Sequence, residues 1–317
     1  EAKKKCYEIN DFMKKPIIFI KILISVFILL SCPTIYAKKA AIIIDYDTKD
    51  VLFEVNADTL NFPASLTKMM TLYITFDYLK KNKLSWDTKM RVSNTASSRS
   101  PSKLYLEEGS TIAVQDAVNA LIIKSANDVA TVISEKISGS EREFAKLMTS
   151  YAKDIGMKKT TFKNASGLPN RAQFTTARDM AILADAMISN FPNEYKLFNQ
   201  KKFVWKGKTY KTHNRLMLSY EGADGIKTGY IRASGFQLAF SAVKENKRLI
   251  GIYFGGDTGK QRDSTLAFLM NKSFQKLKID TKKKIEKKEN NNIKIENKGK
   301  FKIVVGTFKY KKNAEKH

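Results

Sequence analysis

Serine and lysine residues at a short, fixed spacing are the main candidates for chemistry in this sequence. The pattern Ser-x-x-Lys occurs five times, beginning at Ser65, Ser100, Ser150, Ser241 and Ser273. Only Ser65-Leu-Thr-Lys68 opens an apolar run without Gly or Pro, which predicts a buried helix from Ser65 to Leu79. Side chains three residues apart share a helix face, and the helix N-terminus favours a developing negative charge. In a dry pocket Lys68 could lose its proton and activate Ser65 as a nucleophile.

Two further motifs occur once each, Ser125-Ala-Asn127 and then Lys227-Thr-Gly229. Their order after Ser65 carries more information than any one motif alone. Each has an ordinary structural reading as well: Ser65 as a helix cap, Ser125 and Asn127 as loop hydrogen-bonding residues, and Lys227 as a charge on a strand edge.

The remaining residue types exclude other chemistries. The two cysteines, Cys6 and Cys32, lie in or before a predicted leader, so the mature protein would have neither a disulfide nor a thiol nucleophile. Only His213 and His317 are histidines, which argues against a zinc site built on histidine, and we expect neither a metal nor a cofactor. A Ser-His-Asp triad would depend on His213 alone, so a lysine-assisted serine is favoured.

The three motifs together resemble the active-site-serine superfamily of penicillin-binding proteins. Within it, the sequence from about 40 to 277 resembles the D-Ala-D-Ala carboxypeptidase branch. The segments that carry this resemblance are Pro63-Ala-Ser-Leu-Thr-Lys-Met69, Lys124-Ser-Ala-Asn-Asp-Val-Ala130, Asn164-Ala-Ser-Gly-Leu-Pro169, Thr176-Ala-Arg-Asp-Met180 and Asp224-Gly-Ile-Lys-Thr-Gly-Tyr230.

The resemblance implies a role for each catalytic residue. Ser65 would attack the carbonyl of the penultimate D-alanine of a peptidoglycan stem peptide, and Lys68 would take its proton. Ser125 would relay that proton to the departing amine, with Lys227 keeping the relay electropositive. Asn127 would orient Lys68 and the substrate backbone. β-Lactam antibiotics would acylate the same serine.

The resemblance also implies a substrate-binding set of Thr228, Gly229, Tyr230 and Arg215. The backbone N–H groups of Ser65 and Tyr230 would form the oxyanion hole. Thr228 is one candidate to bind the terminal carboxylate of the substrate, and Arg215 is a second that could equally be an ordinary surface residue.

Three alternatives remain at this level. A class A β-lactamase shares the motifs, but its deacylating Glu normally lies in Glu-x-x-Leu-Asn, and Glu194-Tyr-Lys-Leu-Phe-Asn199 is one residue out of register. A D,D-endopeptidase acting on cross-links would use the same residues. A non-catalytic peptidoglycan-binding protein would have no need of Ser65, Lys68 and Lys227.

The strands and helices that the sequence predicts around these residues indicate an α+β fold. Segments 40–46 and 51–55 predict a β-hairpin, and 236–243 and 248–254 predict two further strands. Capping boxes at Ser140 and Thr176 begin helices in the middle, and a last helix is expected from about 261 to 277. The prediction is a β-lactamase/transpeptidase-like architecture: an antiparallel sheet built from both chain ends, a helical subdomain, and the active site at their junction.

Four regions are expected along the chain. Residues 1–37 read as a leader whose signal peptide starts at Met13 and is cut after Ala37, with an uncleaved anchor or a lipidated Cys32 as alternatives. Residues 38–278 would form the catalytic domain. Residues 279–300 are rich in Lys, Glu and Asn and predict a disordered linker. Residues 301–317 resemble the start of a SPOR peptidoglycan-binding domain.

The leader changes the meaning of the formal net charge of +26. In a cytoplasmic protein such a charge would suggest nucleic acid. For a protein exported to the periplasm, it instead favours the carboxylate-rich cell wall and contact with anionic lipid at the membrane surface. We therefore expect no nucleic-acid partner.

Overall fold

The structure is a computed structural model, which describes the backbone of residues 39–295 and the side chains of residues 39–278. The strands are β1 Ala40–Asp45, β2 Val51–Val55, β3 Lys89–Arg91, β4 Thr111–Ala113, β5 Lys202–Trp205, β6 Lys208–Lys211, β7 Ala223–Ile231, β8 Gly235–Lys244 and β9 Lys247–Gly256. The helices are η1 Ala64–Leu66, α2 Thr67–Lys80, α3 Asn94–Ser97, α4 Val114–Ile123, α5 Asn127–Ser138, α6 Glu141–Asp154, α7 Ala177–Asn190, α8 Pro192–Tyr195, η2 Lys196–Asn199, α9 Arg215–Ser219 and α10 Gly259–Ile295.

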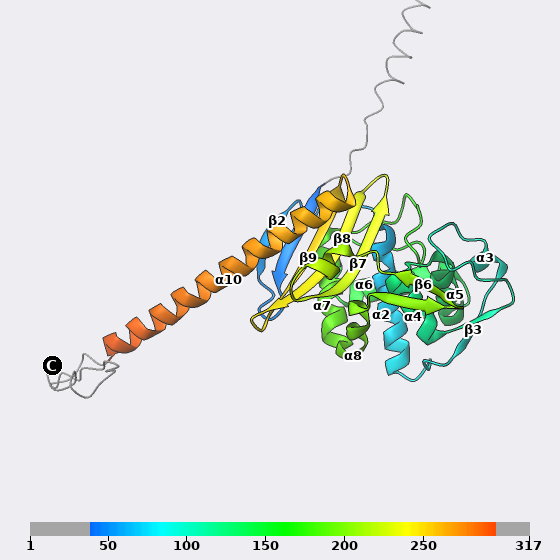
Figure 1. The fold of residues 1–317 in the computed structure, drawn as a ribbon, viewed down its shortest axis with the longest axis horizontal. Helices are drawn as coiled ribbons and strands as arrows, with labels where there is room; N and C mark the ends of the chain where they lie inside the picture. Colours follow the sequence, from blue (N-terminus) through cyan, green and yellow to red (C-terminus); the bar gives the residue numbers. More distant parts are fainter. Residues whose placement is uncertain (1–38, 296–317) are drawn as a thin grey trace, which may run out of the picture. The chain divides into compact units, whose positions relative to one another are not determined.

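The main sheet collects strands from both ends of the described chain (Figure 1). Its order is β2-β1-β9-β8-β7, and every neighbouring pair is antiparallel. This confirms the α+β prediction, including the first hairpin and the two late strands. Because β7 pairs only with β8, it is an edge strand of this sheet. The edge strand β7 and two short hairpins, β3-β4 and β5-β6, were not predicted.

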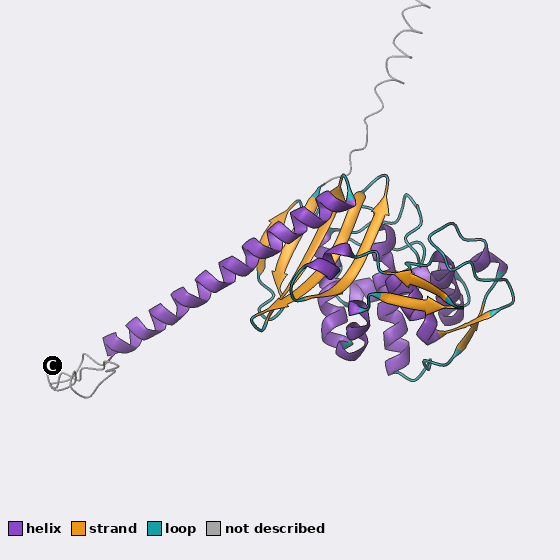
Figure 2. Ribbon diagram, viewed as in Figure 1, coloured by secondary structure: helices purple, strands orange, loops and turns teal. Residues whose placement is uncertain are grey.

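The two faces of the sheet pack against different helices, because successive side chains of a strand point to opposite faces (Figure 2). In β1, Ile42 and Ile44 join a large core formed with helices α2 and α4 to α7. Ala41 and Ile43 instead join a smaller core formed with Leu266, Met270 and Phe274 of α10. The helices that carry the sequence motifs therefore lie on the face opposite α10.

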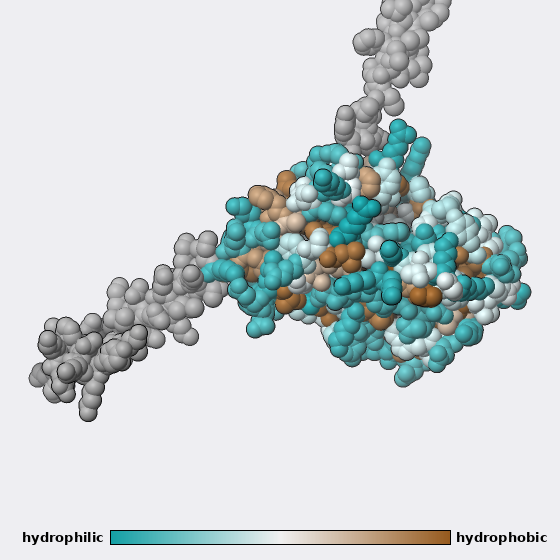
Figure 3. Space-filling view, in the orientation of Figure 1, coloured by the Kyte–Doolittle hydropathy of each residue, from teal (hydrophilic) through white to brown (hydrophobic). Residues whose placement is uncertain are grey.

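The predicted capping boxes begin helices α6 and α7. The side chain of Ser140 accepts a hydrogen bond from the backbone N–H of Glu143, and that of Thr176 accepts one from Asp179. Each bond satisfies an N–H group that has no partner within its own helix. Outside the cores, hydrophilic side chains dominate the face seen in Figure 3, and apolar residues are scattered among them.

Helix α10 is longer than the sequence indicated. It continues to Ile295, whereas a linker without secondary structure was expected from 279 onward. Residues 279–295 contain no Gly or Pro and many Lys and Glu, which are good helix formers even where they bury nothing. The predicted leader and the SPOR-like segment 301–317 lie outside the described residues. Among those described, no helix is both long and apolar enough to cross a bilayer.

Candidate active site

Ser65 lies in a tight turn at the start of the central helix. Residues Ala64–Leu66 form a 3-10 turn that leads directly into α2, so the α-helix proper begins two residues later than predicted. The turn is held between two glycines. A side-chain carbon added to Gly229 of β7 would lie 3.4 Å from the Ser65 backbone nitrogen, and one added to Gly167 would lie 1.7 Å from the Ala64 carbonyl oxygen. The backbone of the nucleophile turn therefore packs directly against two distant segments.

Lys68 is fully buried one turn after Ser65. Its Nζ donates hydrogen bonds to Ser65 Oγ at 3.1 Å, to Asn127 Oδ1 at 2.7 Å and to the Ser166 carbonyl oxygen at 2.5 Å. Burial lowers the pKa of Lys68 well below its ordinary value, and the positive charge of Lys227 lowers it further. A low pKa makes the neutral amine accessible, and this is the form that can accept a proton from Ser65.

Ser125 and Asn127 are positioned by the turn between α4 and α5. Asn127 is the first residue of α5, and its side-chain amide donates to the carbonyl of Ser100 at 2.9 Å while its backbone N–H donates to the carbonyl of Ser102 at 2.7 Å. Ser125 has a positive φ of 60°. Its hydroxyl is buried and has no hydrogen-bond partner among the described residues, so it is free to bond to a substrate group.

Lys227 lies on β7, beside the nucleophile turn. Its side chain is buried and donates a hydrogen bond to the Thr228 carbonyl oxygen at 3.0 Å. Burial, followed by the positive charge of Arg262, lowers the pKa of Lys227 to about 7. The tertiary structure thus brings two buried lysines so close that the positive charge of Lys227 lowers the pKa of Lys68.

Two residues that the sequence did not indicate hold the peptide before Ser65. The Gln237 side chain donates to the Phe62 carbonyl oxygen at 2.7 Å, and the Ser234 hydroxyl accepts from the Phe62 N–H at 3.0 Å. Gln237 is fully buried and lies opposite Gly229 in the β7-β8 pair. Both bonds join residues more than 170 positions apart, so no local sequence pattern could have revealed them.

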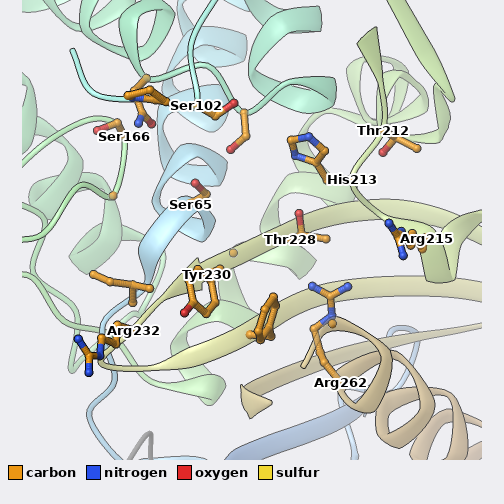
Figure 4. Close-up of a pocket in the computed structure, with 18 of the residues that line it drawn as sticks. Ser65, Ser102, Ser166, Thr212, His213, Arg215, Thr228, Tyr230, Arg232 and Arg262 are labelled. Carbon is orange, nitrogen blue, oxygen red and sulfur yellow. The ribbon is translucent and has the colours of Figure 1, made fainter. Parts of the chain in front are cut away.

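An open cleft with a volume of about 1060 Å³ contains Ser65. Ser125, Asn127 and the predicted substrate-binding residues Arg215, Thr228, Gly229 and Tyr230 also line it, whereas Lys68 and Lys227 lie beneath its surface. Figure 4 shows Ser65 with Ser166 on one side and Thr228 and Tyr230 on the other. The cleft also includes residues that the sequence left unassigned, among them Ser102, Ser166, His213, Arg232 and Arg262.

The geometry supports neither a Ser-His-Asp triad built on His213 nor a class A β-lactamase site built on Glu194. His213 lines the cleft, but Ser65 Oγ bonds to Lys68 and not to His213 in the described structure. Glu194, from the lactamase-like pattern, lies in α8 and is not a cleft residue. The single carboxylate lining the cleft is that of Asp263, which forms an ion pair with Arg262 at 2.7 Å.

A serine hydrogen-bonded to a buried lysine, a second hydroxyl without a partner among the described residues and a lysine-bearing edge strand are the features of an active-site-serine enzyme of the penicillin-binding type. The fold agrees, since the structure matches penicillin-binding protein D2 from Listeria monocytogenes, solved in its cefotaxime-bound form, with a TM-score of 0.69 and 30% identity over 75% of this chain and 98% of that one. The sequence profile of the D-alanyl-D-alanine carboxypeptidase family matches residues 29–258. This chain belongs to that family.

Two relatives show how far the similarity extends. D-alanyl-D-alanine carboxypeptidase DacF of Bacillus subtilis is 35% identical over 80% of this chain and 69% of its own length. DacC of Escherichia coli is 35% identical over 75% of this chain and 64% of its own length. The chain therefore spans roughly two thirds of the curated relatives that it matches.

Proposed function

We propose that this chain is a serine D-Ala-D-Ala carboxypeptidase that removes the terminal D-alanine from peptidoglycan stem pentapeptides through an acyl-enzyme on Ser65. The observation that carries the proposal is the environment of Lys68. It is fully buried, its pKa is lowered, and it is hydrogen-bonded to the hydroxyl of Ser65, which lines the cleft.

Acylation follows from the hydrogen bonds of Lys68. A neutral amine has two N–H donors and one lone pair. The two donors suit the Asn127 side-chain oxygen and the Ser166 carbonyl, which leaves the lone pair for the proton of Ser65. As Lys68 takes that proton, Ser65 Oγ attacks the carbonyl carbon of the penultimate D-alanine and a tetrahedral intermediate forms.

The nucleophile turn and β7 together stabilise that intermediate. The Ser65 N–H lies beside Gly229, so the Ser65 and Tyr230 N–H groups form an oxyanion hole, with each donor contributing roughly 3 kcal/mol. The substrate's terminal carboxylate binds to the Thr228 hydroxyl and to Arg215, both of which line the same cleft.

Release of D-alanine requires a proton on the leaving nitrogen. The Ser125 hydroxyl donates its proton to the amine and receives one from protonated Lys68, while Lys227 keeps this part of the cleft positive. The C–N bond breaks, and Lys68 returns to its neutral form. It then deprotonates a water molecule that hydrolyses the Ser65 ester, which releases the shortened peptide.

A β-lactam presents a strained amide to the same serine, and the cefotaxime complex of the Listeria protein supports the same acylation here. Its ring-opened ester would block Ser65. The apolar leader read from the sequence supports export, which would place the enzyme on the periplasmic side of the inner membrane, where its substrate lies.

The test is release of free D-alanine from diacetyl-L-Lys-D-Ala-D-Ala, measured for the wild type, Ser65→Ala and Ser150→Ala. Ser150 begins another Ser-x-x-Lys pattern, but it is exposed on α6 and is the matched control. We expect Ser65→Ala to abolish release and Ser150→Ala to leave it unchanged. Equal release by the wild type and Ser65→Ala would refute the mechanism, and rapid turnover of penicillin by the wild type would favour a lactamase instead. Cleavage of a cross-linked muropeptide at its cross-link would indicate an endopeptidase.

A further inference from the structure

The cleft around Ser65 contains more positive charge than one terminal carboxylate can use. Asp263 is the single acid that lines it, and this acid is already paired with Arg262. Four other lining cations have no acidic partner within the described part of the chain: Lys211, Arg215, Arg232 and Lys260. A cleft with several unpaired cations favours a ligand that carries more than one negative charge.

Two of these cations lie at opposite ends of the cleft. In Figure 4, Arg215 lies beyond Thr228 on one side of Ser65, and Arg232 lies beyond Tyr230 on the other. Arg232 follows the last residue of β7, four positions after Thr228. A strand rises about 3.3 Å per residue, so the two positions are roughly 13 Å apart along the strand.

The edge of β7 gives a peptide substrate a defined path between these ends. The strand pairs with β8 on one side, and its other edge has no strand partner among the described residues. An extended peptide can bind to such an edge. With its terminal carboxylate at Thr228 and its penultimate residue at Ser65, the third residue from the C-terminus comes close to Tyr230. A long side chain on that residue points toward Arg232.

We propose that Arg232 binds a carboxylate on the side chain of the third residue from the C-terminus, so that the cleft favours stem peptides with a side-chain carboxylate there, as in meso-diaminopimelate, over those whose side chain carries only an ammonium group. This inference rests on the proposed carboxypeptidase function. Arg232 is exposed and has no acidic partner among the described residues, so a side-chain carboxylate at this point gains a charged partner. The side-chain ammonium group is common to meso-diaminopimelate, its amide and lysine, so the carboxylate alone distinguishes the first from the other two. Because Arg232 lies on the acyl side of the scissile bond, its contact persists in the acyl-enzyme.

The experiment compares three N-acetylated peptides, X-D-Ala-D-Ala, in which X is meso-diaminopimelate, its side-chain amide or L-lysine. The kcat/KM for D-alanine release is measured for the wild type, Arg232→Gln, Arg232→Lys and the control Arg91→Gln. Arg91 is exposed and lies outside the cleft. For an exposed ion pair we expect the wild type to prefer the free acid about fivefold over both the amide and L-lysine, because both lack the carboxylate.

We expect Arg232→Gln to bring the acid and the amide within about twofold of each other, Arg232→Lys to restore part of the preference, and Arg91→Gln to retain all of it. The preference should also weaken as the ionic strength rises. Equal kcat/KM values of the wild type for acid and amide would overturn the inference while leaving the carboxypeptidase function intact. A preference that survives Arg232→Gln would also overturn it. Absence of D-alanine release from every peptide would instead refute the proposed function itself.

Discussion

The side-chain nitrogen of Lys68 lies 3.1 Å from the hydroxyl oxygen of Ser65, in a position where the lysine is fully buried. Both its remaining hydrogen bonds are to uncharged oxygens, of Asn127 and Ser166. With no carboxylate bonded to it, the ammonium form is not compensated for the loss of its hydration. The contact therefore favours proton transfer from Ser65 to Lys68, which is what a nucleophilic serine requires.

Replacing Lys68 with Arg should stop acylation, because it puts a permanently charged group where a neutral amine is needed. A guanidinium does not lose its proton in a protein, so the base is lost. We expect the rate of acylation by a fluorescent penicillin to fall at least about 100-fold. Lys146→Arg, on the exposed face of α6, is the control and should react at the wild-type rate. Acylation of Lys68→Arg within a few-fold of the wild type would show that another group activates Ser65.

Lys227 should make stability depend on pH. Its pKa is about 7 in the folded protein and near the ordinary value of 10.5 in the unfolded chain. Between these values the unfolded chain binds more protons, so the free energy of unfolding rises as the pH rises above about 7. Below about 7 both states are protonated and this dependence ends.

Replacing Lys227 with Met should reduce that rise without abolishing it, because the buried Lys68 also has a lowered pKa and adds a rise of its own. Urea unfolding of both proteins at about pH 7 and about pH 9 measures it as the change in free energy of unfolding between the two values. Lys247→Met, at an exposed lysine whose pKa is raised by Asp47, is the control and should keep the rise. The same slope in the wild type and in Lys227→Met would mean that Lys227 is not the group responsible.

Gly167 and Gly156 form a matched pair for testing how the nucleophile turn is packed. Both have positive φ values, of 87° and 93°, but a side chain at 167 would meet the Ala64 carbonyl at 1.7 Å, whereas position 156 has nothing within 4 Å. Gly156→Ala should cost about 1 to 2 kcal/mol of stability through its backbone conformation alone. Gly167→Ala should cost at least about 2 kcal/mol more and should slow β-lactam acylation strongly. Similar losses in both variants would rule out the contact with Ala64 as the cause.

Gln237 should act as a positioning residue for Ser65. Removing its side chain with Gln237→Ala leaves the Phe62 carbonyl unpaired and loosens the turn against β7. We expect about a tenfold fall in kcat with a smaller change in KM, because the oxyanion hole depends on this alignment. Gln200→Ala, which removes a bond to Asn119 away from the cleft, is the control for stability. If the two variants lose the same stability and also show the same fall in kcat, Gln237 has only a structural role.

Much of the local structure could be read from the sequence. The alternation of apolar residues in 40–46 and 51–55, the capping boxes at Ser140 and Thr176, and the spacing of Ser65 and Lys68 on one helical turn all depend on neighbours a few residues apart. The sequence did not predict the C-terminal part of α10, because a stretch rich in Lys and Glu is compatible both with a disordered linker and with a helix. In the structure this stretch is helical as far as Ile295.

The sequence by itself identified the motif residues of the site and their order, because such residues are recognised by type and spacing. Only the tertiary structure decided their properties. The low pKa values of Lys68 and Lys227 come first from burial and then from a neighbouring positive charge, that of Lys227 for Lys68 and that of Arg262 for Lys227. The alignment of Ser65 comes from contacts of Gly167, Gly229 and Gln237 with the turn. Such contacts join segments up to 175 residues apart, and they exist only once the whole core has packed.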